Sequence, residues 1–229
     1  MFLGEGLGAV GEADGEVCFN TAMTGYQEIL TDPSYAAQIV AFTFPHVGNV
    51  GTNNEDIETS SPAAAAAARG AIFRTTPTIP SNWRAQDDLS TWMKKRNVIG
   101  LAGLDTRALT RRIREHGMPN AVIAHAPNGK FDLEKLKKRA AEWPGLLGLD
   151  LAKEVTTAQS YVVNEGRWQW PLGVPTVDKP KFTVVVIDYG VKRNILRALG
   201  DIGARTIVLP ATATAEDVLA HKPDGVLLS

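Results

Sequence analysis

Three short apolar runs near the end of the chain restrict the fold more than any other feature of the sequence. FTVVVIDYG (residues 182–190), RTIVLP (205–210) and DGVLLS (224–229) are mostly apolar and are separated by two stretches with helical periodicity. Strands that are apolar on both faces need cover on both faces, which is typical of a parallel sheet with helices on either side. The sequence therefore predicts an α/β fold in this region.

The second helical stretch carries its own start signal. Thr214 is followed three residues later by Asp217, which predicts a capping box. The given sequence then stops on Ser229, at the tip of the third predicted strand. Because three strands and two helices are too few for a doubly wound domain, we expect this domain to be incomplete, with the chain cut part-way through it.

The region before these strands loses its periodicity and is predicted to join two domains. Pro171, Pro175 and Pro180 stiffen it and remove backbone donors. We therefore predict an N-terminal domain at residues 1–150, a linker at 151–180 and the start of a second domain at 181–229.

Within the first domain, two short strands flank a turn. Residues 16–20 and 38–44 are β-branched and aromatic and are bounded by Gly, Pro and Asp, which is typical of strands. Between them, Asp32 precedes Pro33. An aspartate that binds the backbone and a proline with fixed φ favour a tight turn, which would present Ser34 and Tyr35 at a loop edge.

Two helices are predicted in the middle of the chain. Asp105 is placed to cap the first, and Gly117 to end it. Asp132 is placed to cap the second, and Pro144 follows its end. Both have one apolar face, so we expect both to pack on a sheet. The six alanines Ala63 to Ala68 favour a helix by propensity alone, and we infer no chemistry from them.

The charge balance argues against several classes of partner. There are 24 Lys and Arg residues against 25 Asp and Glu, a net charge of -1, so no strong field exists to hold nucleic acid or an anionic membrane. No stretch approaches the ~20 apolar residues of a membrane span, and no basic start of a signal peptide is visible. With a single cysteine, neither an internal disulfide nor a thiolate metal cage can form, and we predict a cytoplasmic protein.

No complete active site is visible in the sequence. Cys18 lies in a strand pattern and is interpreted as buried and inert, and no two histidines have a metal-ligand spacing, so no metal is predicted. The loop after Asp188 lacks the glycines of a dinucleotide site, and no phosphate-binding P-loop occurs. Arg107, Arg111 and Arg114 share one side of a helix; a phosphate stripe is conceivable, but a solvated or partner-facing surface is favoured.

Long ordered strings add what composition cannot. The chain resembles the small, glutamine-hydrolysing subunit of carbamoyl-phosphate synthase, a ligase subunit, over almost its whole length. The strings that carry the resemblance are CFNTAMTGYQEILTDPSYAAQIVAFTFPHVGNVGTNNEDIE, GLAGLDTRALTRRIREHGMPNAVIAH, WPGLLGLDLAKEVTTAQSY, VVVIDYGVKRNILRAL and VLPATATAEDVLAHKPDGVLLS.

The resemblance implies a fold and a partner. The fold would be an N-terminal β/α domain followed by the first part of a flavodoxin-like class I glutamine amidotransferase domain. The partner would be the large synthetase subunit, which uses ATP, magnesium and bicarbonate and receives ammonia released from glutamine. No cofactor is expected in this chain itself. The product, carbamoyl phosphate, would feed arginine and pyrimidine biosynthesis.

The resemblance also implies a role for one residue of this chain and predicts that the catalytic residues of the family are not part of it. Ser34, in LTDPSYA, matches the serine with which the family's first domain helps to hold glutamine. A hydroxyl suits this role because it can donate to a carboxylate and accept from an ammonium. The family's nucleophilic cysteine, histidine and glutamate follow the strand that DGVLLS matches, so we expect no catalytic residue in these 229 residues. The alanine run also departs from the mixed residues usual at that place.

Two other function classes stay open at this point. A flavodoxin-like redox protein would hold flavin at the strand tips, and a flavin absorption spectrum would identify it. A non-catalytic interaction module would bind the large subunit regardless of glutamine.

Overall fold

The computed structural model describes residues 1–59 and 67–229 and divides them into two compact units. Among the described residues, one unit comprises residues 1–57 and 67–149, and the other comprises 58–59 and 150–229. Of the alanine run Ala63 to Ala68, residues 63–66 lie outside the described part of the chain, while Ala67 and Ala68 are buried.

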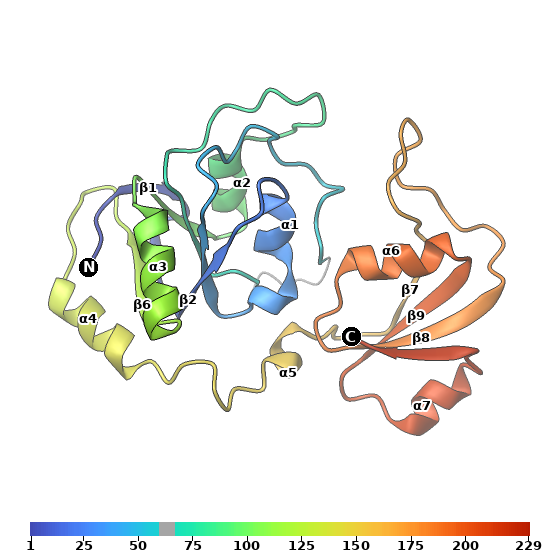
Figure 1. Cartoon of the computed structure of the whole chain (residues 1–229). Coiled ribbons are helices and arrows are strands. Elements are labelled where there is room, and N and C mark those ends of the chain that lie inside the picture. The colour runs from blue at the N-terminus through green and yellow to red at the C-terminus, as the bar shows by residue number, and fades with distance from the viewer. Residues whose placement is uncertain (60–66) are drawn as a thin grey trace. The chain divides into compact units, whose positions relative to one another are not determined.

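The first unit is built on a six-stranded sheet with the order β1-β5-β4-β3-β2-β6. Figure 1 labels its outer strands β1 and β6 and the strand β2. The four central strands are parallel, and the two outer strands, β1 and β6, each pair antiparallel with their neighbour. The strands are β1 (Glu5–Gly8), β2 (Gly11–Asn20), β3 (Gln38–Phe42), β4 (Gly70–Ile72), β5 (Ile99–Ala102) and β6 (Asn120–His125).

Apolar layers cover both faces of this sheet. On one face, α1 (Tyr26–Thr31) and α2 (Leu89–Lys95) pack over Val40 and Phe42, and the Phe42 ring stacks on Phe73 with centroids 5.4 Å apart. On the other face, α3 (Thr106–His116) packs Leu109 and Ile113 against β-strand residues such as Ile39. The central strands are buried because both helix layers shield them from water.

The predicted helix caps are confirmed. Asp105 accepts a hydrogen bond from the Ala108 amide at the start of α3, and Gly117 forms its C-cap. Asp132 likewise accepts from the Lys135 amide at the start of α4 (Leu133–Glu142). However, α4 contains no buried residue, so it lies on the sheet less deeply than its apolar periodicity suggested.

The second unit contains a four-stranded sheet with the order β10-β8-β9-β7. The strands β8 (Phe182–Asp188), β9 (Ala204–Pro210) and β10 (Gly225–Leu228) are parallel, as predicted, and β7 (Tyr161–Val163) is antiparallel to β9. The helix α6 (Arg193–Asp201) covers one face through Leu196, and α7 (Ala215–Ala220) partly covers the other through Val218. The predicted capping box of Thr214 and Asp217 is present.

Residues 151–180, predicted as a linker, differ from that expectation. They contain α5 (Leu151–Val155) and β7, and β7 adds an edge strand to the second sheet. The segment also packs closely on α6, because a Cβ at Gly200 would lie 2.0 Å from the Glu165 carbonyl oxygen. A three-residue strand is too short to produce a periodic pattern, which explains why the sequence did not reveal it.

The predicted α/β class is confirmed. The second unit holds two strand–helix–strand crossovers whose helices lie on opposite faces, compatible with the first part of a flavodoxin-like domain. In the part of the chain that the structure describes, no helix combines the length and apolar character needed to span a bilayer.

Candidate functional site

The candidate site is the turn that carries Ser34, at the end of a helix the sequence analysis did not anticipate. The helix α1 begins after Gly25, whose φ of 79° is unfavourable for other residues. Its apolar side chains Tyr26 and Leu30 are buried in the first core. Pro33 follows the helix and starts the 3-10 turn η1 (Pro33–Tyr35), because its fixed φ suits the first position of a turn.

The predicted role of Asp32 in this turn is confirmed. Its carboxylate accepts a hydrogen bond from the Ser34 amide at 2.9 Å, and its carbonyl accepts from the Tyr35 amide at 3.0 Å. Asp32 and Pro33 are buried, whereas Ser34 is exposed. The Ser34 hydroxyl makes no hydrogen bond to any residue that the structure describes, so it is available to a ligand.

Buried polar contacts fix α1 to the loop at residues 51–56. The side-chain amide of Gln27 donates to the Asn53 carbonyl and accepts from the Asn53 amide at 2.9 Å. The Tyr26 hydroxyl donates to the Gly51 carbonyl at 2.9 Å, and burial raises the pKa of this phenol to about 12. Because these groups are buried, each bond would cost its desolvation penalty if broken. The Ser34 turn is therefore held on a rigid base.

The base extends to the end of β2 and into the 51–56 loop. Asn20 donates to the Tyr35 hydroxyl at 2.9 Å. Asn53 donates to Asp56 at 2.8 Å, and the Asp56 carboxylate also accepts from Arg84 at 2.8 Å. Gln27, Asn53 and Asn20 carry no sequence signal that marks them as part of this base. A buried Gln in a helix of two turns leaves no signal that separates it from an exposed one.

Cys18 is buried in β2, as predicted. Burial raises the pKa of its thiol to about 11, with the Glu16 carboxylate adding to the rise. A thiol with so high a pKa carries almost no thiolate at neutral pH, and the thiolate is the reactive form. Cys18 is therefore unsuited to nucleophilic catalysis.

The acidic loop near His46 does not assemble a metal centre. Asp56 and Glu55 both bind Arg84, at 2.8 and 2.9 Å. Across the described residues, no three His, Cys, Asp or Glu side chains gather closely enough to hold a metal ion.

At the tip of β8, Asp188 organises the following loop. Its buried carboxylate accepts hydrogen bonds from the amides of Gly190, Val191 and Thr157 at 2.7 to 2.9 Å. This is the sheet edge at which an open α/β domain binds ligands. Here the Asp188 carboxylate fixes the loop backbone through these hydrogen bonds. The sequence, with Gly190 as the single glycine of the loop, did not indicate this role.

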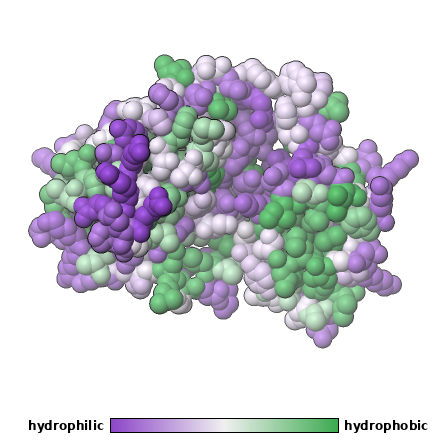
Figure 2. All heavy atoms as spheres, in the orientation of Figure 1, coloured by the Kyte–Doolittle hydropathy of each residue, from purple (hydrophilic) through white to green (hydrophobic). Residues whose placement is uncertain are grey.

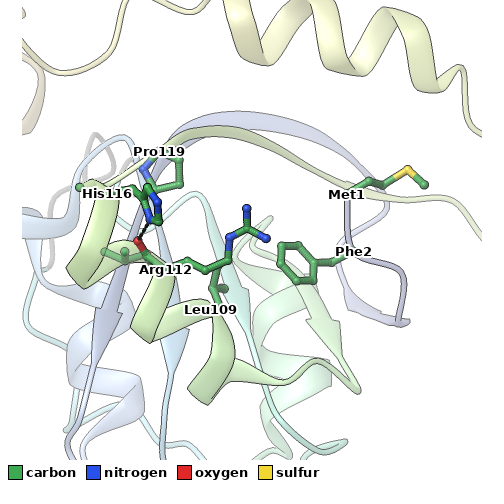
Figure 3. A pocket seen from close by; sticks show the side chains of 8 residues that line it. Met1, Phe2, Leu109, Arg112, His116 and Pro119 are labelled. Atoms are coloured by element: carbon green, nitrogen blue, oxygen red, sulfur yellow. Dashed lines mark hydrogen bonds between the residues drawn. The ribbon is translucent and has the colours of Figure 1, made fainter.

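The first unit contains a cavity of about 480 Å³ (Figure 3). Met1, Phe2 and the second half of α3 line it, and Ser34 is not among its lining residues. The Arg112 guanidinium points towards the Phe2 ring, while the His116 ring lies near the Arg112 carbonyl at 3.1 Å. This cavity does not belong to the Ser34 site.

Comparison with known proteins identifies the family of this chain. Residues 1–123 match the family model of the carbamoyl-phosphate synthase small chain, CPSase domain. Over 226 residues, 99% of this chain, it is 66% identical to the carbamoyl phosphate synthase small chain of Caulobacter vibrioides and 62% identical to that of Bradyrhizobium diazoefficiens. The corresponding protein of Brucella anthropi is 63% identical. The chain spans 56 to 58% of the length of these curated relatives. A family model that covers more than half of the chain, supported by this identity, places the chain in the carbamoyl-phosphate synthase small-chain family.

Proposed function

We propose that this chain forms part of the glutaminase subunit of a carbamoyl-phosphate synthase. The complete subunit hydrolyses glutamine to glutamate and passes ammonia to a large synthetase subunit. That subunit joins ammonia to bicarbonate with ATP and magnesium, in the cytoplasm, and the carbamoyl phosphate supplies arginine and pyrimidine synthesis. Membership of the small-chain family supports the proposal.

Ser34 is the residue of this chain that we propose contacts glutamine. The observation that carries this role is an exposed hydroxyl that bonds to none of the described residues, on a turn whose backbone is fixed by buried Asp32. A positioned hydroxyl can bind the carboxylate or the ammonium of glutamine without first reorganising the chain. Pre-organisation of this kind favours ligand binding over a free loop.

The nucleophile comes from elsewhere in the complete subunit. Cys18 is the single cysteine of the sequence, and its buried thiol has a raised pKa. We therefore place the reactive cysteine, its histidine base and the orienting carboxylate in the part of the relatives' length that this chain does not span. There a thiolate would attack the amide carbon, and backbone amides would stabilise the oxyanion.

The test uses Ser34→Ala in the full-length small subunit bound to its large subunit. Loss of a hydrogen bond to a charged group costs about 1.5–3 kcal/mol, so we expect KM for glutamine to rise roughly 10- to 100-fold. Synthesis from added ammonia bypasses the glutamine site and should be nearly unchanged. Both rates are measured as carbamoyl phosphate formed per unit time.

Ser81→Ala is the matched control, because Ser81 is exposed and, among the residues that the structure describes, its hydroxyl has no partner, while its backbone amide donates to the Asn49 carbonyl. It should leave both rates unchanged. If Ser34→Ala lowers the ammonia-dependent and glutamine-dependent rates equally, the serine supports folding rather than glutamine binding, and its proposed role is refuted.

A further inference from the structure

The outward face of α3 carries a concentration of positive charge that the proposed glutamine chemistry does not use. The helix contains Arg107, Arg111, Arg112 and Arg114 but a single acidic residue, Glu115. The whole chain has a net charge of -1. Positive charge is therefore gathered locally on this helix rather than spread over the surface.

Helical spacing puts three of these arginines on one side. Thr106, Leu109 and Ile113 are the buried residues that face the sheet. Arg107, Arg111 and Arg114 are separated by four and three residues, so they form one stripe on the opposite side, and all three are exposed. Figure 2 shows a strongly hydrophilic patch over α3. We call this stripe the arginine face.

Several arginines elsewhere in the chain use their charge in ion pairs within the protein. Arg139 binds Asp14 at 2.7 Å, Arg193 binds Glu165 at 2.6 Å, and Arg84 binds Asp56 at 2.8 Å. The side chains of Arg107, Arg111 and Arg114 have no ion pair or hydrogen bond within the described ranges 1–59 and 67–229. Three guanidinium groups thus keep all their donors open.

Stability of the helix accounts for only part of this arrangement. Like charges three and four residues apart on a helix repel each other. Arg107 also lies in the first turn, where the helix dipole disfavours a cation, whereas Arg114 lies in the last turn, where the dipole favours one. Residues that oppose the stability of their own element are common at binding surfaces, because a ligand supplies the compensating charge.

We propose that the arginine face docks an acidic patch on the large synthetase subunit. The identity of this partner rests on the proposed function. A guanidinium group binds a carboxylate through two parallel hydrogen bonds, which favours arginine over lysine at such a contact. Seven residues of helix span only about 10 Å, which suits a few carboxylates on a protein better than an extended phosphate backbone. Complementary charge at the rim of an interface mainly accelerates association.

The test compares Arg111→Glu/Arg114→Glu with the unmodified full-length small subunit in binding to the large subunit. At about 50 mM salt we expect the association rate constant to fall roughly tenfold. At about 0.5 M salt the difference should nearly vanish, because screening shortens the range of the field to a few ångströms. Arg111→Lys/Arg114→Lys keeps the charge, so it should preserve the association rate but dissociate about threefold faster.

Lys94→Glu/Lys130→Glu is the control, because it changes the net charge equally at two other exposed positions of the same unit. It should leave association within about twofold of the unmodified protein. Equal loss in both charge-reversed proteins, or no loss in either, overturns the proposal. The proposal is also overturned if the Arg111→Glu/Arg114→Glu protein loses binding to an RNA oligonucleotide or to anionic vesicles while its binding to the large subunit is unchanged.

Glutamine hydrolysis by the isolated full-length small subunit, measured on the same samples, separates this inference from the proposed function. Absent hydrolysis in the unmodified protein refutes the proposed function, while a slower association still supports the docking surface. Normal hydrolysis with unchanged association refutes the docking surface alone.

Discussion

The two sheets of this chain bury their strands to very different extents. In the first unit, β3 and β4 are paired on both edges and covered on both faces, so nearly all their residues are buried. In the second unit, β10 is paired on one edge of the described sheet, and Val226 and Leu228 are 53% and 66% exposed. Apolar parallel strands are thus fully buried in the first unit, whereas β10 of the second unit is a partly exposed apolar strand at the edge of the described sheet.

This difference indicates that the two units are stabilised in different ways. The first unit relies on two apolar layers, including the stacked pair of Phe42 and Phe73. The second has smaller apolar clusters. Both units carry ion networks, but the one in the second unit, in which Glu165 binds Arg193 and Arg197 of α6, includes a buried arginine, Arg197. Apolar burial and ion pairs respond differently to mutation and pH, so the contrast can be tested.

The largest effect is expected from Phe42→Ala. Phe42 is 1% exposed, and truncating a buried phenylalanine typically costs about 3–5 kcal/mol through lost burial and the cavity left behind. In Phe42→Ala, the first unit should unfold at a lower urea concentration than in the unmodified chain. Phe131→Ala is the control, because Phe131 is 37% exposed and should cost under about 1 kcal/mol. Similar losses from the two would contradict the view that burial stabilises this unit.

A smaller, pH-dependent effect is expected from Glu165→Gln. Arg197 is 7% exposed, so removing the Glu165 charge leaves a buried cation without this partner. We expect the second unit to lose about 2 kcal/mol at pH 7, less than for a fully buried pair because Glu165 is partly exposed.

The pH dependence follows from the pKa of Glu165. Burial raises this pKa, but the hydrogen bonds and charges of Arg193 and Arg197 lower it by a larger amount. The pKa of Glu165 in the folded protein is therefore below its ordinary value. The contribution of Glu165 is therefore complete above its unfolded pKa of about 4.3 and is lost as the pH falls through the folded pKa. Unfolding free energies of the unmodified and Glu165→Gln proteins should converge in that range. Glu142→Gln, at an exposed pair with Lys138, should change little at either pH.

The smallest effect is expected from Thr214→Ala at the start of α7. The change removes one half of the capping box, which costs about 1 kcal/mol. Because α7 has no buried residues, the loss should be local and should appear as faster hydrogen exchange at its first amides. Thr212→Ala, at an exposed position before the cap, should not change exchange. Global destabilisation by Thr214→Ala would show that α7 is coupled to the core more strongly than its exposure indicates.

Local signals in the sequence predicted the elements that have strong patterns or caps. The parallel strands β8 and β9 and the caps at Asp105, Asp132 and Thr214 all lie where the sequence placed them. The order of the strands was not predictable, because pairing across the sheet depends on contacts between residues far apart in the chain. Short elements such as β4 and β7 also escaped detection, since three residues show no period.

Of the candidate site, the exposed turn was predicted from the sequence, but the buried residues that support it were not. Asp32 and Pro33 have recognisable turn chemistry, and the structure confirms the bond from the Ser34 amide. The support beneath the turn was invisible, because Gln27 and Asn53 are distant in sequence and resemble exposed polar residues until the fold buries them. The contact of Ser34 with glutamine stays a prediction.

The buried amide pair of Gln27 and Asn53 has one mechanical consequence. Together with the bond from Tyr26 to Gly51, it makes the helix before Ser34 and the loop at residues 51–53 a single solid body. The position of Ser34 is therefore held by these buried hydrogen bonds, although the residue itself is exposed. We therefore expect the helix before Ser34 and the loop at residues 51–53 to unfold together.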